Sequence, residues 1–274
     1  MIKTIIIGKN SNLSNKLIFK IYNCISISSR DILDNINILK EYKDEKINII
    51  FNNFQPATML NNISNVEKYI ENSIGITSKI LNFFRINNIK INKVIYTSSS
   101  SVYGNNILCS ENDELKPLNL HASLKVSNEK LIENFCMENN IDYTIARIFN
   151  MYGGDDNFSI ISKIINAYKS NSELTIVNNG NAIRDFIHID DVVDIYIRLL
   201  EIKDIKILNV GTGNGTSIKN IIDFLYNQNI KLKTKNIFRD ELKTSTSNNR
   251  LLFDRLKKEN FIKVENYVKR ELNI

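Results

Sequence analysis

Short apolar runs alternate along the chain with longer stretches that carry apolar residues at helical spacing. The runs predict strands, because apolar residues without alternation suit a sheet that is buried on both faces. The predicted strands are Lys3–Ile7, Ile25–Ser28, Ile47–Phe51, Val94–Thr97, Tyr143–Phe149 and Ile207–Val210. The predicted helices are Asn15–Tyr22, Ser64–Asn88 (one helix or two), Ala122–Glu138, Ser159–Ser170 and Ile218–Tyr226. Strands that alternate with helices predict an α/β fold with a doubly wound parallel sheet.

The regular alternation weakens after about residue 150, where helices, short strands and polar loops are mixed. We therefore expect residues 1–150 to form the sheet domain and residues 151–274 to form mainly a smaller cap at the carboxyl edge of the sheet. No stretch rich in Pro, Gly and Ser separates the two parts, so segments of the cap are expected to return to the sheet domain. In such folds ligands bind outside the carboxyl ends of the strands, and functional residues are expected there.

Composition narrows the class of protein. The chain has 274 residues, of which 43% are apolar and 24% charged, which excludes a disordered tail, a fibre or a disulfide scaffold. Three cysteines fit a reducing compartment, no apolar run has the length of a membrane span, and the N-terminus predicts a strand rather than a signal peptide. We expect a cytoplasmic protein with no membrane partner. The net charge is +6, but the basic residues are scattered, which argues against a nucleic-acid partner.

The turn after the first predicted strand has small residues at three-residue spacing: Gly8, Ser11 and Ser14. A dinucleotide-binding turn needs small residues there, because the chain bends tightly and the pyrophosphate approaches the backbone. Serine is small but has a Cβ atom. The alternative is an ordinary strand-to-helix turn in which Ser11 or Ser14 caps the helix.

The second predicted strand leads into Arg30 and Asp31. An arginine at this strand end favours the 2′-phosphate of NADP, whereas an acidic residue favours the ribose 2′-hydroxyl of NAD. We expect NADP or NAD as the cofactor, with NADP slightly favoured. The alternative is that Arg30 is a solvated loop charge.

Candidate chemistry lies after the strand at Val94–Thr97, where consecutive serines include Ser99 and Ser100. Farther on, His121 and Lys125 are four residues apart and so share one face of a predicted helix. A hydroxyl, an imidazole and a lysine that converge on a carbonyl or an alcohol suit proton transfer coupled to hydride transfer. The alternatives are a polar serine loop and a histidine that caps the helix or lies on its surface.

Six motifs in order along nearly the whole chain resemble the extended short-chain dehydrogenase/reductase family, in its NAD(P)-dependent nucleotide-sugar epimerase, dehydratase and reductase branch. They are NSIG (72–75), TSSSSVYG (97–104), HASLK (121–125), RIFNMYG (147–153), GNAIRDFIHIDD (180–191) and NVGTGNGT (209–216). The resemblance implies a Rossmann-type dinucleotide-binding domain in residues 1–150 and a C-terminal substrate-binding cap.

The resemblance also implies roles for single residues. Ser99 would hydrogen-bond the reacting sugar oxygen, and Lys125 would hold the nicotinamide ribose and lower the pKa of the acid/base. The pyrophosphate would be lined by Gly8, Ser11 and Ser14, with Asn52 beside the cofactor. The implied substrate-binding residues are Ser100, Asn150, Arg184 and Arg239, the last three at the diphosphate of a nucleotide-diphosphate sugar. A guanidinium binds phosphate oxygens bidentately, but Arg184 has the alternative of an ion pair with Asp185 or Asp190.

The sequence departs from the family in two places. Ser11 and Ser14 replace glycines of the turn, and His121 stands where the family has its catalytic tyrosine. An unperturbed histidine titrates at about pH 6.5, and nearby positive charge lowers that value. His121 is therefore either a replacement acid/base, or the mark of a catalytically weak member with a binding or regulatory role. A third alternative places the acid elsewhere, for example at Tyr103.

The strand-end motif also discriminates among reactions. Dehydratases of the family carry Asp-Glu where this chain has Ser100 and Ser101, and the cysteine-dependent mode is disfavoured because Cys109 lies beyond the motif. Two reactions remain: reduction of a 4-keto sugar nucleotide (or the reverse oxidation) and 4-epimerisation with retained NAD. The weakened turn favours the reductase, in the biosynthesis of surface-polysaccharide sugars. The resemblance further implies a homodimer formed by the helices near Ile76–Arg85 and Ala122–Glu138, and no metal.

Overall fold

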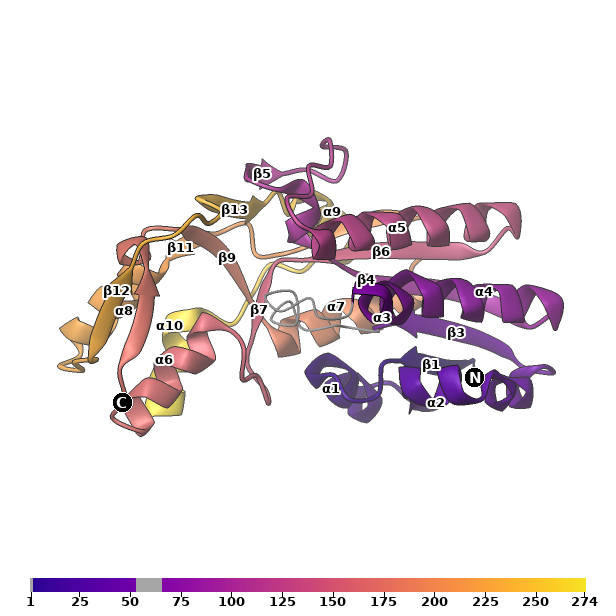
Figure 1. The fold of residues 1–274 in the computed structure, drawn as a ribbon, viewed down its shortest axis with the longest axis horizontal. Helices are drawn as coiled ribbons and strands as arrows, with labels where there is room; N and C mark the ends of the chain where they lie inside the picture. The colour runs from indigo at the N-terminus through magenta and orange to yellow at the C-terminus, as the bar shows by residue number, and fades with distance from the viewer. Residues whose placement is uncertain (1, 53–65) are drawn as a thin grey trace. The chain divides into compact units, whose positions relative to one another are not determined.

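The computed structural model describes residues 2–52 and 66–274, which form two compact units. Unit 1 is made of Met1–Val102, Pro117–Arg147 and Tyr196–Leu208. Unit 2 is made of Tyr103–Lys116, Ile148–Ile195 and Asn209–Ile274. Each unit is thus assembled from three separate segments, and the elements are labelled in Figure 1. The assignment of dinucleotide binding to residues 1–150 and substrate binding to 151–274 stays a prediction.

Unit 1 is built on a six-stranded sheet with the order β10-β6-β4-β3-β1-β2. The strands are β1 (Lys3–Ile7), β2 (Cys24–Ile27), β3 (Lys46–Phe51), β4 (Lys90–Ser99), β6 (Asp142–Ile148) and β10 (Ile207–Val210). They are the six strands predicted from the apolar runs, although β4 is longer at both ends. β1 pairs in parallel with β2 and β3, and β3 pairs in parallel with β4, so the predicted Rossmann-type α/β fold is confirmed.

Helices cover the sheet because alternate strand residues point to opposite faces. On one face, Ile5, Ile49 and Tyr96 lie in a core shared with Ile80 and Ile132. The helical elements are α1 (Asn12–Lys20), α2 (Ser29–Asp34), the 3₁₀-helix η1 (Ile36–Tyr42), α3 (Val66–Ile70), the π-helical turn η3 (Glu71–Gly75), α4 (Ile76–Ile86) and α5 (Leu120–Glu138). α4 and α5 lie side by side (Figure 1).

Two predicted helix boundaries were wrong. The helix predicted over Asn15–Tyr22 is α1, which begins at Asn12 because Ser11 caps it and ends at Lys20. The stretch Ser64–Asn88 contains α3, η3 and α4 in succession, and its first two residues lie outside the described part of the chain. A π-helical turn has no distinct apolar period, so the pattern alone did not reveal it.

A buried ion pair joins α5 to the sheet. Arg147 on β6 donates from Nη2 and Nε to Glu129 on α5, at 2.7 and 3.1 Å, and both side chains are 3% exposed. Ser98 on β4 donates to the same carboxylate. A buried carboxylate needs such partners, because an unpaired charge in the interior is costly. The pair therefore fixes α5 against both β4 and β6.

Unit 2 is formed by shorter elements. Its strands are β5 (Asn106–Cys109), β7 (Asn150–Tyr152), β8 (Leu174–Val177), β9 (Ile183–His188), β11 (Gly215–Ser217), β12 (Thr234–Ile237) and β13 (Thr244–Ser247). One sheet has the order β11-β9-β13-β5 with β7 also paired to β9, and a second pairs β12 with β8. The remaining helical elements are η4 (Ser100–Tyr103), α6 (Ile160–Lys169), η5 (Asn178–Gly180), α7 (Ile189–Glu201), α8 (Ile218–Asn227), α9 (Arg250–Leu256) and α10 (Val264–Leu272). Two of them, η4 and α7, have residues in both units.

Asp185 is the polar centre of unit 2. Its buried carboxylate accepts hydrogen bonds from the backbone N–H groups of Thr212, Gly213 and Ser247, and from the hydroxyls of Thr212 (2.6 Å) and Ser247 (2.5 Å). An added Cβ at Gly211 would lie 2.7 Å from the same carboxylate. The motif GNAIRDFIHIDD, which contains Asp185, is therefore hydrogen-bonded to the motif NVGTGNGT. The close approach of the carboxylate explains why Gly211 of the latter motif has no side chain.

The burial of the Glu129–Arg147 pair predicts that it contributes strongly to the free energy of unfolding. Glu129→Gln leaves the Arg147 guanidinium buried without its carboxylate, and we expect the free energy of unfolding to fall by about 3–5 kcal/mol. Urea unfolding followed by circular dichroism measures this. The control is Asp223→Asn, which removes an exposed ion pair with Lys219 (2.9 Å) and should cost less than about 1 kcal/mol. Equal losses in the two variants would contradict the assignment.

Candidate active site

The site begins where the strand order of the sheet reverses. The chain runs from β1 to β2 on one side, whereas β3 lies on the other side of β1. Ligands of doubly wound sheets bind outside the carboxyl ends of the strands at this reversal. Gly8 follows β1 with φ of 115°, a conformation that favours glycine, and Asn52 follows β3 and donates from its backbone N–H to Ile7 O at 2.8 Å. Both predicted residues therefore lie at the expected place.

The two serines of the turn form a polar cluster with Asn52. Ser11 caps α1 by accepting from Ser14 N at 3.0 Å, so the capping alternative is confirmed for Ser11. The two hydroxyl oxygens are 2.9 Å apart, and Asn52 Nδ2 donates to both, at 2.6 and 2.8 Å. The two hydroxyl groups thus connect Asn52, which follows β3, to the start of α1. A cap does not exclude a phosphate site, since other backbone N–H groups of a helix start remain available to an anion.

Arg30 lies in the first turn of α2, next to the carboxyl end of β2. Ser28 caps this helix and accepts from Arg30 N at 3.2 Å. The side chains of Arg30 and Asp31 are both exposed. Their exposure leaves both interpretations of Arg30 open, the phosphate ligand and the solvated charge.

The carboxyl end of β4 carries the predicted hydroxyl residues and receives the predicted lysine. Ser99 is the last residue of β4, and its Oγ accepts from Ser101 N at 3.2 Å. Ser100 begins the 3₁₀-helix η4 and is buried. Lys125 on α5 is only 7% exposed, and its Nζ donates to Thr97 O at 2.7 Å and lies 5.0 Å from the centre of the Tyr96 ring. The structure therefore places a buried ammonium group beside this strand end.

His121 lies in the first turn of α5 and is half-buried. Asn119, not His121, caps the helix, by accepting from Ala122 N at 2.9 Å. The Nδ1 atom of His121 is 3.0 Å from the hydroxyl oxygen of Tyr69 on α3. The alternative that His121 is a cap or a surface residue is therefore wrong.

Burial sets the protonation states in this region. Burial and, second, the charge of Lys125 lower the pKa of His121 to about 4. Burial lowers the pKa of Lys125 to about 8, against the opposing effect of Glu129. Burial also raises the pKa of the Tyr69 phenol. Near neutral pH the site therefore holds a neutral imidazole, a protonated phenol and a buried ammonium.

The predicted diphosphate ligands lie in unit 2. Asn150 on β7 donates from Nδ2 to Asp185 O at 3.4 Å. Arg184 on β9 has Nη2 3.4 Å from Glu241 Oε2, so the suggested ion pair with Asp185 or Asp190 was wrong. Arg239 is exposed, and its backbone exchanges two hydrogen bonds with the Asn178 side chain, at 2.7 and 3.2 Å. Asn178 also donates to the Glu241 carboxylate. It therefore connects the backbone of Arg239 to the carboxylate that pairs with Arg184.

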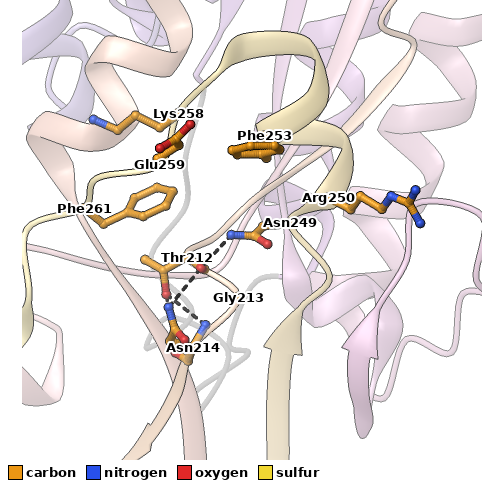
Figure 2. Close-up of a pocket in the computed structure, with 9 residues that line it drawn as sticks. All are labelled: Thr212, Gly213, Asn214, Asn249, Arg250, Phe253, Lys258, Glu259 and Phe261. Carbon is orange, nitrogen blue, oxygen red and sulfur yellow. Dashed lines mark hydrogen bonds between the residues drawn. The ribbon is translucent and has the colours of Figure 1, made fainter.

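A separate pocket of about 570 Å³ lies within unit 2 (Figure 2). It is lined by Thr212, Gly213, Asn214, Asn249, Arg250, Phe253, Lys258, Glu259 and Phe261, with Asn249 and Asn214 hydrogen-bonded to Thr212 O. Its Lys258 ammonium already pairs with Asp191 at 2.7 Å and Asp194 at 3.4 Å. No site residue predicted from the sequence is among these lining residues, so we do not assign the pocket to the reaction.

Sequence reasoning missed two residues that the structure brings to the site. Tyr69 contacts His121 although 52 positions separate them, and Glu129 is the buried partner of Arg147. A signal for Glu129 existed, because it stands four residues after Lys125 on the same helix face. No pattern pointed to Tyr69, which lies three residues before the NSIG motif.

Residues 2–52 and 66–274 contain no group of three His, Cys, Asp or Glu side chains that could hold a metal ion. Within the same ranges no helix is both long and apolar enough to cross a membrane.

The fold and the residues at the carboxyl ends of β1 and β4 define an extended short-chain dehydrogenase/reductase. The model of the NAD dependent epimerase/dehydratase family matches residues 5–211, and the chain belongs to that family. The family resemblance read from the six motifs is thereby confirmed.

Relatives illustrate the range of the family. An uncharacterised protein of Methanocaldococcus jannaschii is 32% identical over 76% of this chain and 65% of its own length. The GDP-6-deoxy-D-talose 4-dehydrogenase of Aggregatibacter actinomycetemcomitans is 25% identical over 80% of this chain and 75% of its own. Three of the curated relatives are matched over only 50% to 65% of their own length.

A solved structure extends the likeness of fold. The UDP-glucuronic acid 4-epimerase of Bacillus cereus, in complex with UDP-glucuronic acid and NAD, has a TM-score of 0.86 and covers 99% of this chain and 98% of its own. The identity is 20%, so this likeness shows the fold alone.

The lowered pKa of His121 predicts a pH dependence of stability. Between pH 6.5, its ordinary value, and about 4, the unfolded chain binds a proton that the folded protein does not. The free energy of unfolding should therefore fall as the pH falls through this range. His121→Gln removes the contribution and should give a shallower slope in urea unfolding measured at about pH 7 and about pH 4.5. His188 is present in both proteins, so any contribution it makes is common to the two slopes. Identical slopes would show that His121 is not held neutral.

Proposed function

We propose that this protein is an NAD(P)-dependent nucleotide-sugar oxidoreductase that reduces a 4-keto sugar nucleotide or catalyses the reverse oxidation. The observation that carries the proposal is the pairing, on one face of α5, of a neutral His121 with the buried ammonium of Lys125 at the carboxyl end of β4. This end of the strand also carries Ser99. An alcohol and a carbonyl interconvert by loss or gain of a hydride and a proton, and these residues supply the proton half of that chemistry.

The residues at the strand reversal fit a dinucleotide. Gly8 has the positive φ that a tight turn requires, and α1 begins directly after it, so backbone N–H groups are available to a phosphate. Gly8, Ser11 and Ser14 would line the pyrophosphate, with Asn52 behind them. Arg30 at the end of β2 would favour the 2′-phosphate of NADP. The bound nicotinamide dinucleotide would supply or accept the hydride.

The residues on α5 would handle the proton. A neutral imidazole has one N–H donor and one acceptor nitrogen, so His121 can give a proton to a sugar oxygen or take one from a sugar hydroxyl. The Lys125 charge favours the anionic form of that oxygen as the proton moves, because opposite charges attract strongly in a buried site. Lys125 would also hold the nicotinamide ribose, and Ser99 would hydrogen-bond the sugar oxygen.

The substrate proposed is a nucleotide-diphosphate sugar. Asn150, Arg184 and Arg239 would bind its diphosphate, and Arg184 would exchange Glu241 for phosphate oxygens. Ser100 would contact the sugar. A structural neighbour in complex with UDP-glucuronic acid supports this substrate class. A homodimer, a cytoplasmic location and a place in polysaccharide biosynthesis stay predictions.

A 4-epimerase is the second candidate. The Bacillus cereus neighbour is a 4-epimerase, whereas a relative from Aggregatibacter actinomycetemcomitans is a 4-dehydrogenase. An epimerase must retain its dinucleotide through a full cycle. The serine-lined turn, with Cβ atoms where the family has glycines, argues for weaker retention and so for the reductase. A catalytically weak protein with a binding role is the outcome if the dinucleotide binds without turnover.

The first test is titration of the purified protein with NADH and NADPH, followed by the change in nicotinamide fluorescence. We expect saturable binding of one dinucleotide, with NADPH preferred. Arg30→Ala should reduce this preference about tenfold, the loss of one charge-assisted contact of about 1.4 kcal/mol. Absence of binding to either dinucleotide, in a protein that circular dichroism shows to be folded, would overturn the redox proposal.

The second test is turnover with a panel of nucleotide-diphosphate 4-keto sugars and reduced dinucleotide. Lys125→Ala removes the buried ammonium and should lower kcat by at least about 10²-fold, the scale of a positioned catalytic group. It should also weaken dinucleotide binding. The matched control is Lys130→Ala, which removes an exposed lysine of the same helix and should leave both quantities unchanged. Turnover that survives in Lys125→Ala would show the proposed arrangement to be wrong.

A further inference from the structure

Tyr69 contacts the residue that replaces the family's catalytic tyrosine. Its hydroxyl oxygen is 3.0 Å from His121 Nδ1, and its side chain is only 6% exposed. We propose that Tyr69 and His121 form a two-proton relay, in which Tyr69 is a positioning residue that supplies its phenol proton to the sugar oxygen through the imidazole ring. The inference rests on the proposed function and deepens it, because it concerns the proton donor of the same reaction.

The imidazole alone does not balance the proton transfer. A neutral His121 that gave up its one N–H proton would become an imidazolate, a very strong base. Protonated His121 would avoid this, but burial and Lys125 disfavour the imidazolium at neutral pH. A second proton must therefore reach the ring as the first one leaves, and the nearest donor shown is the Tyr69 hydroxyl on Nδ1.

The relay can be written atom by atom for the reducing direction. At the start, Tyr69 O–H donates to Nδ1, so the imidazole proton is on Nε2. The carbonyl carbon gains the hydride of the reduced nicotinamide dinucleotide, which is oxidised, and the sugar oxygen takes the proton from Nε2. The O–H bond of Tyr69 breaks and an Nδ1–H bond forms. The ring stays neutral and the phenolate bears the negative charge. After the product leaves, the Nδ1 proton returns to the Tyr69 oxygen and Nε2 takes a proton from water, which restores the starting tautomer; oxidation is the reverse.

The helix that carries Tyr69 is held in place for this contact. α3 is followed directly by the π-helical turn η3, which adds a residue to one turn and so changes the face that α3 presents relative to α4. Asn128 on α5 donates to the Ser73 hydroxyl in that turn at 3.2 Å. Thr77 on α4 donates to Ser73 O, also at 3.2 Å. The turn before α4 is thus tied to the same helix that carries His121.

The relay explains how the family's chemistry survives the substitution. The proton still comes from a phenol, but the phenol lies one imidazole ring farther from the substrate. The hydrogen bond from Tyr69 holds the imidazole ring in one tautomer, with its proton on Nε2. Burial and, second, the charge of Lys125 lower the pKa of His121, so they keep the ring in the neutral form that the relay requires.

The first test reads the tautomer directly and needs neither dinucleotide nor substrate. The chain has only two histidines, so long-range ¹H–¹⁵N spectra of ¹⁵N-labelled protein are simple, and His121→Gln assigns the signals. We expect His121 to be the Nε2–H tautomer at neutral pH and to change toward a mixture in Tyr69→Phe. Tyr143→Phe, which removes a phenol 3.4 Å from Glu133, should leave the spectrum unchanged. A His121 spectrum that is the same in Tyr69→Phe and wild type would overturn the proposal.

The second test separates a relay from a hydrogen bond that only stabilises the fold. Tyr69→Phe should lower kcat at least about 10²-fold with little change in KM, and should turn a curved dependence of kcat on the D₂O fraction into a linear one. In the His121→Tyr background a phenol reaches the substrate directly, so adding Tyr69→Phe should then cost less than about threefold. Equal losses in the two backgrounds, or an unchanged D₂O dependence, would contradict the relay.

The two proposals fail in different ways. If the dinucleotide does not bind but the tautomer depends on Tyr69, the proposed function fails and the pairing of Tyr69 with His121 stands as a structural fact without a reaction. If the dinucleotide binds and Lys125→Ala is inactive, while Tyr69→Phe keeps full kcat, the proposed function stands and the relay is wrong.

Discussion

The burial of charge along one face of α5 is the constraint on which the site depends. The buried ammonium group of Lys125 donates a hydrogen bond to the carbonyl oxygen of Thr97, near the carboxyl end of β4. One turn farther along, Glu129 is held by Arg147 and Ser98, so the helix is anchored to two strands through charged and polar atoms. Breaking such a buried pair is much costlier than losing an exposed one. The anchoring therefore fixes the distance between α5 and the strand end where the reaction is proposed.

The same burial decides which acid/base chemistry is available. A histidine beside a buried ammonium is held neutral, and a neutral imidazole moves protons only if it can both give and receive them. The Tyr69 hydroxyl oxygen lies 3.0 Å from the Nδ1 atom of that ring. In the proposed relay, the tyrosine of the family and the histidine of this chain would meet one requirement in different ways, a proton donor that works at neutral pH next to a positive charge.

Several residues of the family motifs make contacts that stabilise the fold. Arg147 opens the RIFNMYG motif but pairs with Glu129, and Asp185 of the RD motif binds the NVGTG loop. Gly153 has φ of 94°, and an added Cβ there would lie 2.7 Å from Cδ2 of His188. Such motifs identify a family strongly because they report how the chain is held together. They say less about the reaction, which depends on the few residues that differ.

The sequence by itself determined the six strands of unit 1, several of the helices apart from their exact ends, and the family. Apolar runs and motif spacing are local properties, and a strand buried on both faces leaves its mark in consecutive residues. It also indicated that Gly8 and Ser99 lie at strand ends and that His121 and Lys125 share one face of a helix. Only the tertiary structure decided what these residues contact. The Tyr69–His121 pair, the Asn52 amide on two serines and the Arg184–Glu241 pair join residues that are 38 to 57 positions apart. No local pattern encodes such a contact, because it exists only once the chain has folded and packing has excluded the alternatives.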